Sequence, residues 1–433
     1  MLRKLAPAVL LFASLLCRAA EPNASLSSQV NAIYPEVDAL YLDLHQNPEL
    51  SLHEEKTAAK LAERLRKLGY EVTTGVGGNG IVALMKNGPG PVISLRTDLD
   101  ALPVEEKTGL QYASKVRTKD DAGKDVPVMH ACGHDAHMAS WIGTAIIMAK
   151  TKDQWHGTLM LIGQPAEERV MGAKNMLKDG FLQRFPKPTI GIASHVMNML
   201  PAGKVGITSG YALANSDSVD ITIYGKGGHG AKPDATIDPI VIAARTIMAL
   251  QTIVSREMDP MENAVVTVGQ IHGGTKNNII PDHVELGLSV RTYKDDVRKH
   301  VLAAIERIAK AEALAANAPK PPDFTIPEST PATYNDPDIA ARLEPVLKNA
   351  IGEGNVVRTP SIMGSEDYSE FVRAGIPSLY FWVGAANPEA YAKAKADGTQ
   401  LPSNHSPFFA PDPEPTLKTQ ITAEVALLRE LLK

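Results

Sequence analysis

The sequence contains only two cysteines, Cys17 and Cys132, among its 433 residues. It also lacks a long apolar run beyond the first 20 residues, so we expect no transmembrane helix in the mature chain. Its basic residues form no extended block, and the formal net charge at pH 7 is −5, so nucleic acid is not an expected partner. The overall composition, 44% hydrophobic and 21% charged, is that of an ordinary globular protein.

Residues 1–20 have the pattern of an export signal. Met1–Lys4 is basic, Leu5–Leu16 is apolar but too short to span a bilayer, and Ala19 and Ala20 are small residues suited to cleavage. We therefore predict a secreted or periplasmic protein. Lipidation at Cys17 is an alternative, although the residue before it is bulkier than the usual lipoprotein pattern allows.

The remaining chain predicts an α/β fold of two domains. Residues 21–214 and 331–433 are expected to form a catalytic domain with a mixed, mostly parallel sheet. Between them, residues 215–330 have the element order βαββαβ, which indicates an inserted ferredoxin-like domain. In the first part we expect a helix over 30–45 that Pro35 interrupts, a surface loop over 107–127, and a strand over 190–194 followed by a turn at 198–203.

Polar residues follow several of the predicted strands. Asp98 and Asp100 come after the strand at 92–95, Glu167 and Glu168 after the strand at 158–163, and His195 after the strand at 190–194. Each pair of acidic residues could by itself be a turn or the start of a helix. Several such strand ends together instead indicate a site at the carboxyl edge of the sheet.

The segment 129–140, MHACGHDAHMAS, concentrates groups that can bind metal or handle protons: His130, Cys132, His134, Asp135 and His137. A lone cysteine is usually a small buried hydrophobe, and a histidine near a helix start is usually a hydrogen-bonding residue. Signal cleavage would, however, leave Cys132 without a partner for an internal disulfide, which favours a metal ligand. Cysteine and histidine are ligands that zinc prefers.

Four of these residues, together with a histidine near the end of the chain, form a plausible set of ligands for two divalent metal ions. They are Cys132, His134, Glu168, His195 and His405. Such a pair activates water and polarises a carbonyl, and Glu167 would be the general base that passes the proton to a leaving amine. Asp98, Asp100 and Asp135 are candidates to orient the ligand histidines. Zinc fits this set best, although manganese, cobalt or nickel can occupy such sites.

Nine stretches resemble, in order, the dinuclear-metal amidohydrolase and peptidase family of aminoacylases and carboxypeptidase G. The nearest branch contains hippurate hydrolase, N-acetyldiaminopimelate deacetylase and auxin-conjugate (IAA-amino acid) hydrolases. The stretches are RTDLDALPVEE (96–106), MHACGHDAH (129–137), GQPAEE (163–168), SHV (194–196), GKGGHGAKPDATIDP (225–239), NNIIPD (277–282), SVRTY (289–293), MGSEDYSEF (363–371) and NHSPFF (404–409).

The resemblance implies the same five metal ligands, with Glu167 as the catalytic base. It further implies that the insert is a lid that forms a homodimer, with His229 stabilising the oxyanion in a partner's active site. Asn277 and Arg291 would hold the substrate, Arg291 being suited to a carboxylate. Turn and surface roles remain open for these three lid residues. Gly364 and Ser365 are further candidates for substrate binding.

The predicted function is that of an exported, metal-dependent amidohydrolase that cleaves N-acyl amino acids. Aromatic acyl groups are one option, and a dipeptidase or carboxypeptidase on the same scaffold is an alternative. A metal-retaining binding protein that has lost catalysis is less consistent with an intact Glu167. The chain departs from the branch at Met197-Asn198, at Asp234 and in the segments 107–127 and 387–402, so the resemblance does not define the specificity.

Overall fold

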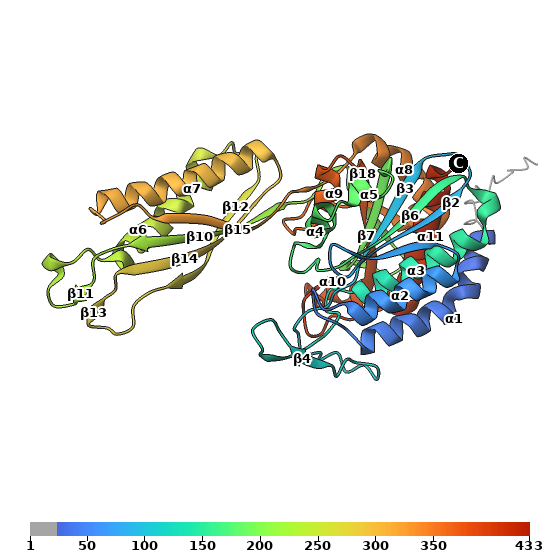
Figure 1. Ribbon diagram of the computed structural model, residues 1–433, viewed down its shortest axis with the longest axis horizontal. Helices are drawn as coiled ribbons and strands as arrows, with labels where there is room; N and C mark the ends of the chain where they lie inside the picture. The colour runs from blue at the N-terminus through green and yellow to red at the C-terminus, as the bar shows by residue number, and fades with distance from the viewer. Residues whose placement is uncertain (1–23) are drawn as a thin grey trace, which may run out of the picture.

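The computed structural model describes residues 24–433 and has two lobes joined by a narrow connection (Figure 1). The predicted export signal and Cys17 lie outside the described residues. The larger lobe contains an eight-stranded sheet whose central strands are parallel. In spatial order its strands are β1 (Glu71–Val76), β2 (Gly80–Asn87), β6 (Gly157–Gln164), β3 (Val92–Asp98), β7 (Ile190–Pro201), β18 (Ser378–Ala386), β8 (Val205–Ile207) and β17 (Val356–Arg358).

Helices cover both faces of this sheet, because its strands present alternate apolar side chains to each side. Leu379 and Phe381 of β18 pack into one core, whereas Tyr380 and Trp382 pack into the other. The larger core lies under α1 (Ala24–Gln46), α2 (Glu55–Lys67), α3 (His134–Lys150), α8 (Pro337–Ile351) and α11 (Pro413–Leu431). The smaller core lies under α4 (Gly172–Lys178), α5 (Phe181–Arg184) and α9 (Ser369–Arg373).

The smaller lobe is a four-stranded antiparallel sheet with two helices. Its elements are β10 (Asn215–Tyr224), α6 (Pro239–Thr252), β12 (Ala264–His272), β14 (His283–Thr292), α7 (Asp295–Ala315) and β15 (Asp323–Thr330), with strand order β12-β14-β10-β15. Val219, Ile221 and Ile223 alternate along β10 and pack with both helices in one core. The predicted βαββαβ order is therefore present. We call this lobe the second domain.

Three local predictions were wrong. Pro35 does not interrupt α1, which continues through it and packs on α3 and α11. A proline inside a helix loses its N–H bond and crowds the carbonyl of the preceding turn, and the tertiary packing of α1 compensates for that cost here. The segment 107–127 is not only loop, because it includes a hairpin of β4 (Arg117–Lys119) and β5 (Asp125–Pro127). The turn expected over 198–203 begins only after Pro201, at residues 202–203, because β7 continues to Pro201, paired with β18.

Shorter elements complete the described fold. β9 (Gly210–Leu213) pairs with β16 (Thr333–Asn335) near the connection between the lobes, and β11 (Gly228–His229) pairs with β13 (Ile279–Ile280) at the far end of the second domain. The segment 387–402 contains α10 (Pro388–Asp397). Among residues 24–433, no helix combines the length and apolarity needed to cross a bilayer.

Candidate metal and active site

The candidate ligands meet at the carboxyl ends of the central strands. His134 is the first residue of α3, Glu168 follows β6, and His195 lies within β7. Gly133 lies between Cys132 and His134 with φ +86°, and a Cβ there would lie 2.4 Å from Cγ2 of Val196. Glycine is therefore required for the tight approach of this turn to β7.

The five predicted ligands lie close together. The Sγ atom of Cys132 is 3.4 Å from Nε2 of His195, and Nε2 of His134 is 3.8 Å from Oε1 of Glu168. The other carboxylate oxygen of Glu168 is 3.4 Å from Nε2 of His405. Ligands on one tetrahedral zinc ion, each about 2.0–2.3 Å from it, are separated by roughly 3.3–3.8 Å. The spacing of these atoms therefore suits metal ligation.

Two buried atoms of the predicted ligands have no hydrogen-bond partner in the described part of the chain, and this observation shows whether a metal ion fits between them. Within residues 24–433, Nε2 of His134 and Oε1 of Glu168 are buried and have no hydrogen bond. Burying such atoms without a partner is costly, and a cation between them would remove that cost. The donor set of one thiolate, three imidazoles and one carboxylate is typical of a zinc-type site.

The backbone holds the ligand histidines by their other nitrogen. Nδ1 of His134 lies 2.8 Å from the carbonyl oxygen of Asp100, and Nδ1 of His195 lies 2.8 Å from that of Val196. Each contact directs Nε2 toward the other ligands, as in many metal sites. His405 has φ +70° and donates its backbone N–H to Ala131 at 2.8 Å. A non-glycine residue in this strained conformation is typical of functional sites.

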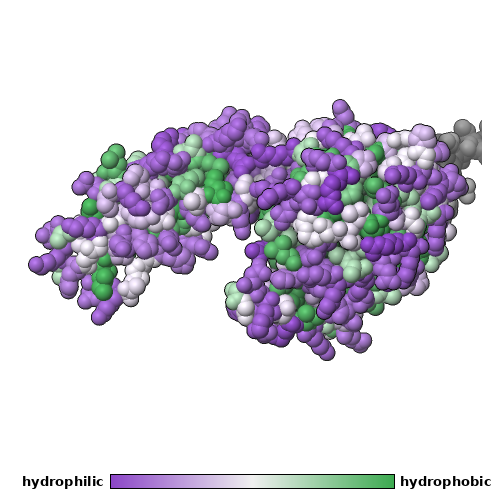
Figure 2. All heavy atoms as spheres, viewed as in Figure 1, coloured by the Kyte–Doolittle hydropathy of each residue, from purple (hydrophilic) through white to green (hydrophobic). Residues whose placement is uncertain are grey.

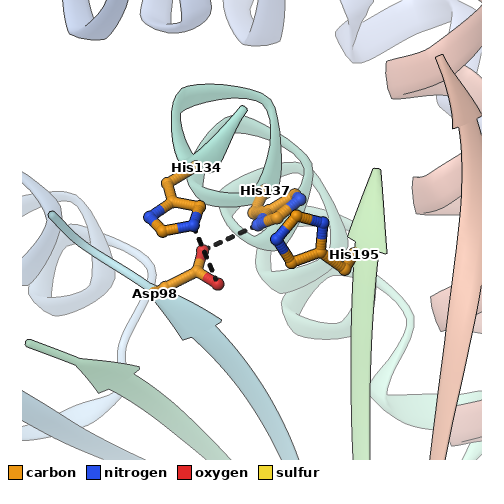
Figure 3. Close-up of side chains that lie close together, drawn as sticks. All are labelled: Asp98, His134, His137 and His195. Atoms are coloured by element: carbon orange, nitrogen blue, oxygen red, sulfur yellow. Dashed lines mark hydrogen bonds and ion pairs between the residues drawn. The ribbon is translucent and has the colours of Figure 1, made fainter. Parts of the chain in front are cut away.

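Asp98 orients His137, a residue to which the sequence assigned no specific role. Asp98 at the end of β3, His134 and His137 in the first turn of α3, and His195 in the middle of β7 converge (Figure 3). Nδ1 of His137 lies 2.7 Å from Asp98, while its Nε2 accepts the backbone N–H of Val196 at 2.9 Å. Both nitrogens are occupied, so His137 supports the strand that carries His195 and is not a ligand. The sequence did hold a signal for this role: His137 lies three residues after His134, which places both side chains on the same face of a helix.

Asp135 does not contact a ligand histidine as expected. Its carboxylate instead lies 2.6 Å from Nδ1 of His45 in α1, and Nε2 of His45 is 3.1 Å from Glu106. Burial lowers the pKa of His45, but the bonds to the two carboxylates outweigh that effect and raise it to about 10. Asp135 therefore joins α3 to α1, and His45 also joins α1 to Glu106 in the segment after β3. Adjacent residues on a helix point in different directions, which separates Asp135 from the ligand His134.

Glu167 is buried beside the ligands and among other carboxylates. Its Oε2 is 3.9 Å from Nε2 of His134, and Glu366 and Asp367 offer oxygens within 4.8 Å. Burial, reinforced by the neighbouring carboxylates of Glu366 and Glu168, raises the pKa of Glu167 well above its ordinary value. A cation bound nearby acts in the opposite direction. The arrangement gives Glu167 the ability to accept and return a proton.

Arg96 is fully buried and links the strand ends. It donates to Asp98 at 2.8 Å, to Glu366 at 2.7 Å and to Gln164 at 2.9 Å. Tyr380 also donates to Glu366, at 3.2 Å. Arg96 begins the RTDLD stretch and Glu366 lies in the SEDY stretch, but their sequence separation concealed the contact. This network fixes the carboxylates around Glu167.

The predicted substrate-binding residues are divided between two places. Arg291 of β14 donates to Ser365 of the larger lobe at 2.8 Å. Ser365 lines a cavity of about 800 Å³ that is also lined by Cys132, Glu168, His195 and His405. The carbonyl of Gly364 accepts the N–H of Ala214, near the connection. His229 and Asn277, by contrast, lie at the far end of the second domain and do not line this cavity.

Residues 94–400 match the family model described as "Peptidase family M20/M25/M40". The chain is 36% identical to Thermostable carboxypeptidase 2 of Saccharolobus solfataricus, covering 93% of this chain and 97% of the relative. It is 34% identical to IAA-amino acid hydrolase ILR1-like 2 of Arabidopsis thaliana, covering 84% and 78%.

Among solved structures, the chain resembles the YXEP protein of Bacillus subtilis, described as a dinuclear metal binding peptidase from the M20 family. The TM-score is 0.75 at 30% identity, covering 93% of this chain and 99% of that one. The arrangement of the site, the family match and these likenesses agree with the resemblance predicted from sequence. The chain therefore belongs to peptidase family M20/M25/M40 and is an amidohydrolase or peptidase of that family.

Proposed function

We propose that the protein hydrolyses the amide bond of N-acyl amino acids and uses two divalent metal ions. The observation that carries this proposal is the convergence of five ligand atoms beside the buried carboxylate of Glu167. Cys132, His134, Glu168, His195 and His405 would hold the ions, and zinc is the metal this donor set favours, with manganese, cobalt or nickel as substitutes. The dinuclear description of the B. subtilis structure supports two ions.

Bound metal ions would lower the pKa of a water molecule and polarise the substrate carbonyl. Glu167 would take the proton from that water and return it to the leaving amine, which its buried position between the ligands and Glu366 permits. Arg291, which reaches the cavity edge at Ser365, would bind the carboxylate of the amino-acid part. Arg96 would hold Glu366 in place beside Glu167 during this transfer.

A homodimer would complete the site. His229 and Asn277 cannot contribute from their position in this chain, so we infer that they act in a partner's active site. The second domain carries large exposed hydrophobic side chains on α6 and β12, among them Val241, Met248 at 71% exposure and Ile271, and hydrophobic residues gather at several places on its visible surface (Figure 2). Such exposed groups are typical of interaction surfaces.

The first experiment is a panel of N-acyl amino acids and dipeptides assayed for amine release. Wild type is compared with Glu167→Gln, with metal content measured in each, and with exposed Glu63→Gln as the matched control. We expect Glu167→Gln to retain its metal, and we expect its rate of amide hydrolysis to fall by about 10²–10⁴-fold relative to wild type. Hydrolysis that survives in this variant would contradict the role of Glu167. Absence of bound metal after reconstitution would contradict the ligand set.

The same panel distinguishes this activity from the second candidate function, that of a carboxypeptidase or dipeptidase. The name of the S. solfataricus relative favours that second function. Both activities use a free carboxylate that Arg291 can bind, so the acyl part decides between them. Preferred hydrolysis of dipeptides over N-acyl amino acids would support the peptidase. A folded, metal-loaded protein that cleaves no substrate would instead agree with a binding protein.

Two further tests address assembly and location. Mixed subunits of Glu167→Gln and His229→Ala should regain activity if His229 acts in the partner's site, because one site per heterodimer keeps both residues. An active protein that sediments as a monomer would contradict this. Export remains our proposal from residues 1–20, and N-terminal sequencing of protein recovered outside the cytoplasm would test it.

A further inference from the structure

The strand that carries His195 continues past the metal site along one wall of the cavity. His195 and Met197 share one face of β7, and the register with β18 becomes irregular after Met197; Met199 follows in this irregular part, and we call the three residues the methionine row. All three line the cavity. This extension exists because β7 pairs with β18 as far as Pro201.

Apolar surface is exposed along this row. Met197 is 6% exposed, whereas Met199 is 65% exposed and is the most exposed large hydrophobic side chain of the larger lobe within residues 24–433. Leu213 and Trp382 line the same cavity. Exposed apolar surface that continues from a catalytic site is typical of a substrate groove, and flexible methionine side chains adapt to variable apolar ligands.

A second wall comes from the segment 387–402, one of those in which the sequence departs from the family branch. Tyr391, Ala394 and Lys395 share one face of α10, and Leu401 follows it in the chain; all four line the cavity. The side chain of Asn198 donates to the carbonyl of Pro402 at 2.8 Å, which fastens this segment to β7 beside the methionine row. The cavity therefore has two structured walls beyond the metal site.

We propose that these walls form an acyl channel, defined by Met197, Met199, Tyr391, Ala394 and Leu401, that selects extended, flexible alkyl acyl groups. This inference rests on the proposed hydrolysis of N-acyl amino acids. The carboxylate of the amino-acid part is assigned to Arg291, which enters at Ser365. The methionine row, which begins at the ligand His195, is then left for the acyl part that extends from the reacting carbonyl.

Lys395 is the polar member of the α10 face. It makes no ion pair within the described residues and is exposed. A lysine can lay its methylene stem along an apolar wall while its ammonium group stays in water, so Lys395 is compatible with an alkyl chain. If its charge instead bound the substrate, acyl groups that end in a carboxylate would be preferred. The experiment below includes such an acyl group.

The test measures kcat/KM for acetyl, butanoyl, hexanoyl, octanoyl and succinyl derivatives of the amino acid that the panel identifies. For wild type we expect a rise of about tenfold for each two methylenes up to octanoyl. Met199→Gln, which keeps the length but adds a polar amide, should reduce the octanoyl value by about tenfold and leave the acetyl value within about twofold. Leu401→Gln on the other wall should act in the same direction.

The matched control is Met261→Gln, since Met261 is 86% exposed in the second domain and lies outside the channel. It should leave the chain-length profile unchanged. A flat wild-type profile, or a profile that Met199→Gln does not alter, would overturn the proposal. A succinyl preference that Lys395→Met removes would also overturn it. Failure of wild type to release amine from any derivative would instead refute the proposed function.

Discussion

Glu424→Gln is expected to change how the stability of the protein depends on pH. Glu424 lies in α11 and is buried, and no cationic side chain among residues 24–433 pairs with it. Its carboxylate accepts hydrogen bonds from Thr144 at 2.7 Å, from Ser194 at 2.9 Å and from Gln420 at 3.0 Å. Burial raises its pKa to about 7, although these hydrogen bonds act in the opposite direction.

The sign and size follow from proton linkage. The ordinary pKa is 4.5 and the folded value about 7, so between these values the native state holds a proton that the unfolded chain releases. The contribution of Glu424 to stability is therefore full below pH 4.5, falls as pH rises through this window and is lost above about pH 7. The loss is about 3 kcal/mol. Glutamine resembles the protonated side chain and does not titrate.

The assay is urea unfolding of wild type and Glu424→Gln at pH 5 and pH 8, with exposed Glu63→Gln as the control. The free energy of unfolding of Glu424→Gln, relative to wild type, should rise by about 2.5 kcal/mol between the two pH values, because pH 5 already lies above the ordinary pKa of 4.5. Because metal binding changes with pH in both proteins, only this difference is compared. An equal difference at both pH values would show that Glu424 is ionised in the native protein and would refute the reasoning.

Three further predictions concern the site. In a urea titration, Arg96→Met should lower the free energy of unfolding by about 3–5 kcal/mol, because it leaves Asp98 and Glu366 buried without their cation. The control Lys86→Met, which removes an exposed ion pair, should lower it by less than about 1 kcal/mol. Asp98→Asn should weaken metal binding about 10–100-fold in competition with a chelator, because His137 loses its charged partner, and unchanged affinity would contradict that role. Metal removal should lower the unfolding midpoint, and zinc at 100 times its Kd should restore about 2.7 kcal/mol; a midpoint that is insensitive to zinc would contradict the ligand set.

The sequence was sufficient for the parts of the site that depend on local pattern. Apolar runs that end in Asp98, Glu167 and His195 predicted strands with polar ends, and parallel strands place such ends along one edge. Cys132 and His134 belong to a short segment whose composition indicated metal. His405 lies far along the chain, and its assignment depended on family resemblance as well as its residue type.

The contacts between these groups depended on tertiary structure. Asp98 lies 3.7 Å from the ligand His134, as the sequence suggested, but its hydrogen bond is to His137. Asp135 contacts His45 and not a ligand histidine. Arg96 and Glu366 are separated by 270 positions. Helical direction and strand pairing decide which of several neighbouring polar groups point toward each other, and local spacing does not specify that choice.

Sequence by itself therefore determined the fold class, the family and the residue types of the site. Local pattern encodes burial and backbone preference, which is the information that places strands and their polar ends. Tertiary structure decided the continuation of β7 to Pro201, the α10 wall and the separation of His229 from the cavity. These features arise from strand pairing and side-chain packing between segments that are distant in the sequence. The energies of these contacts exceed the local conformational preferences of the residues involved.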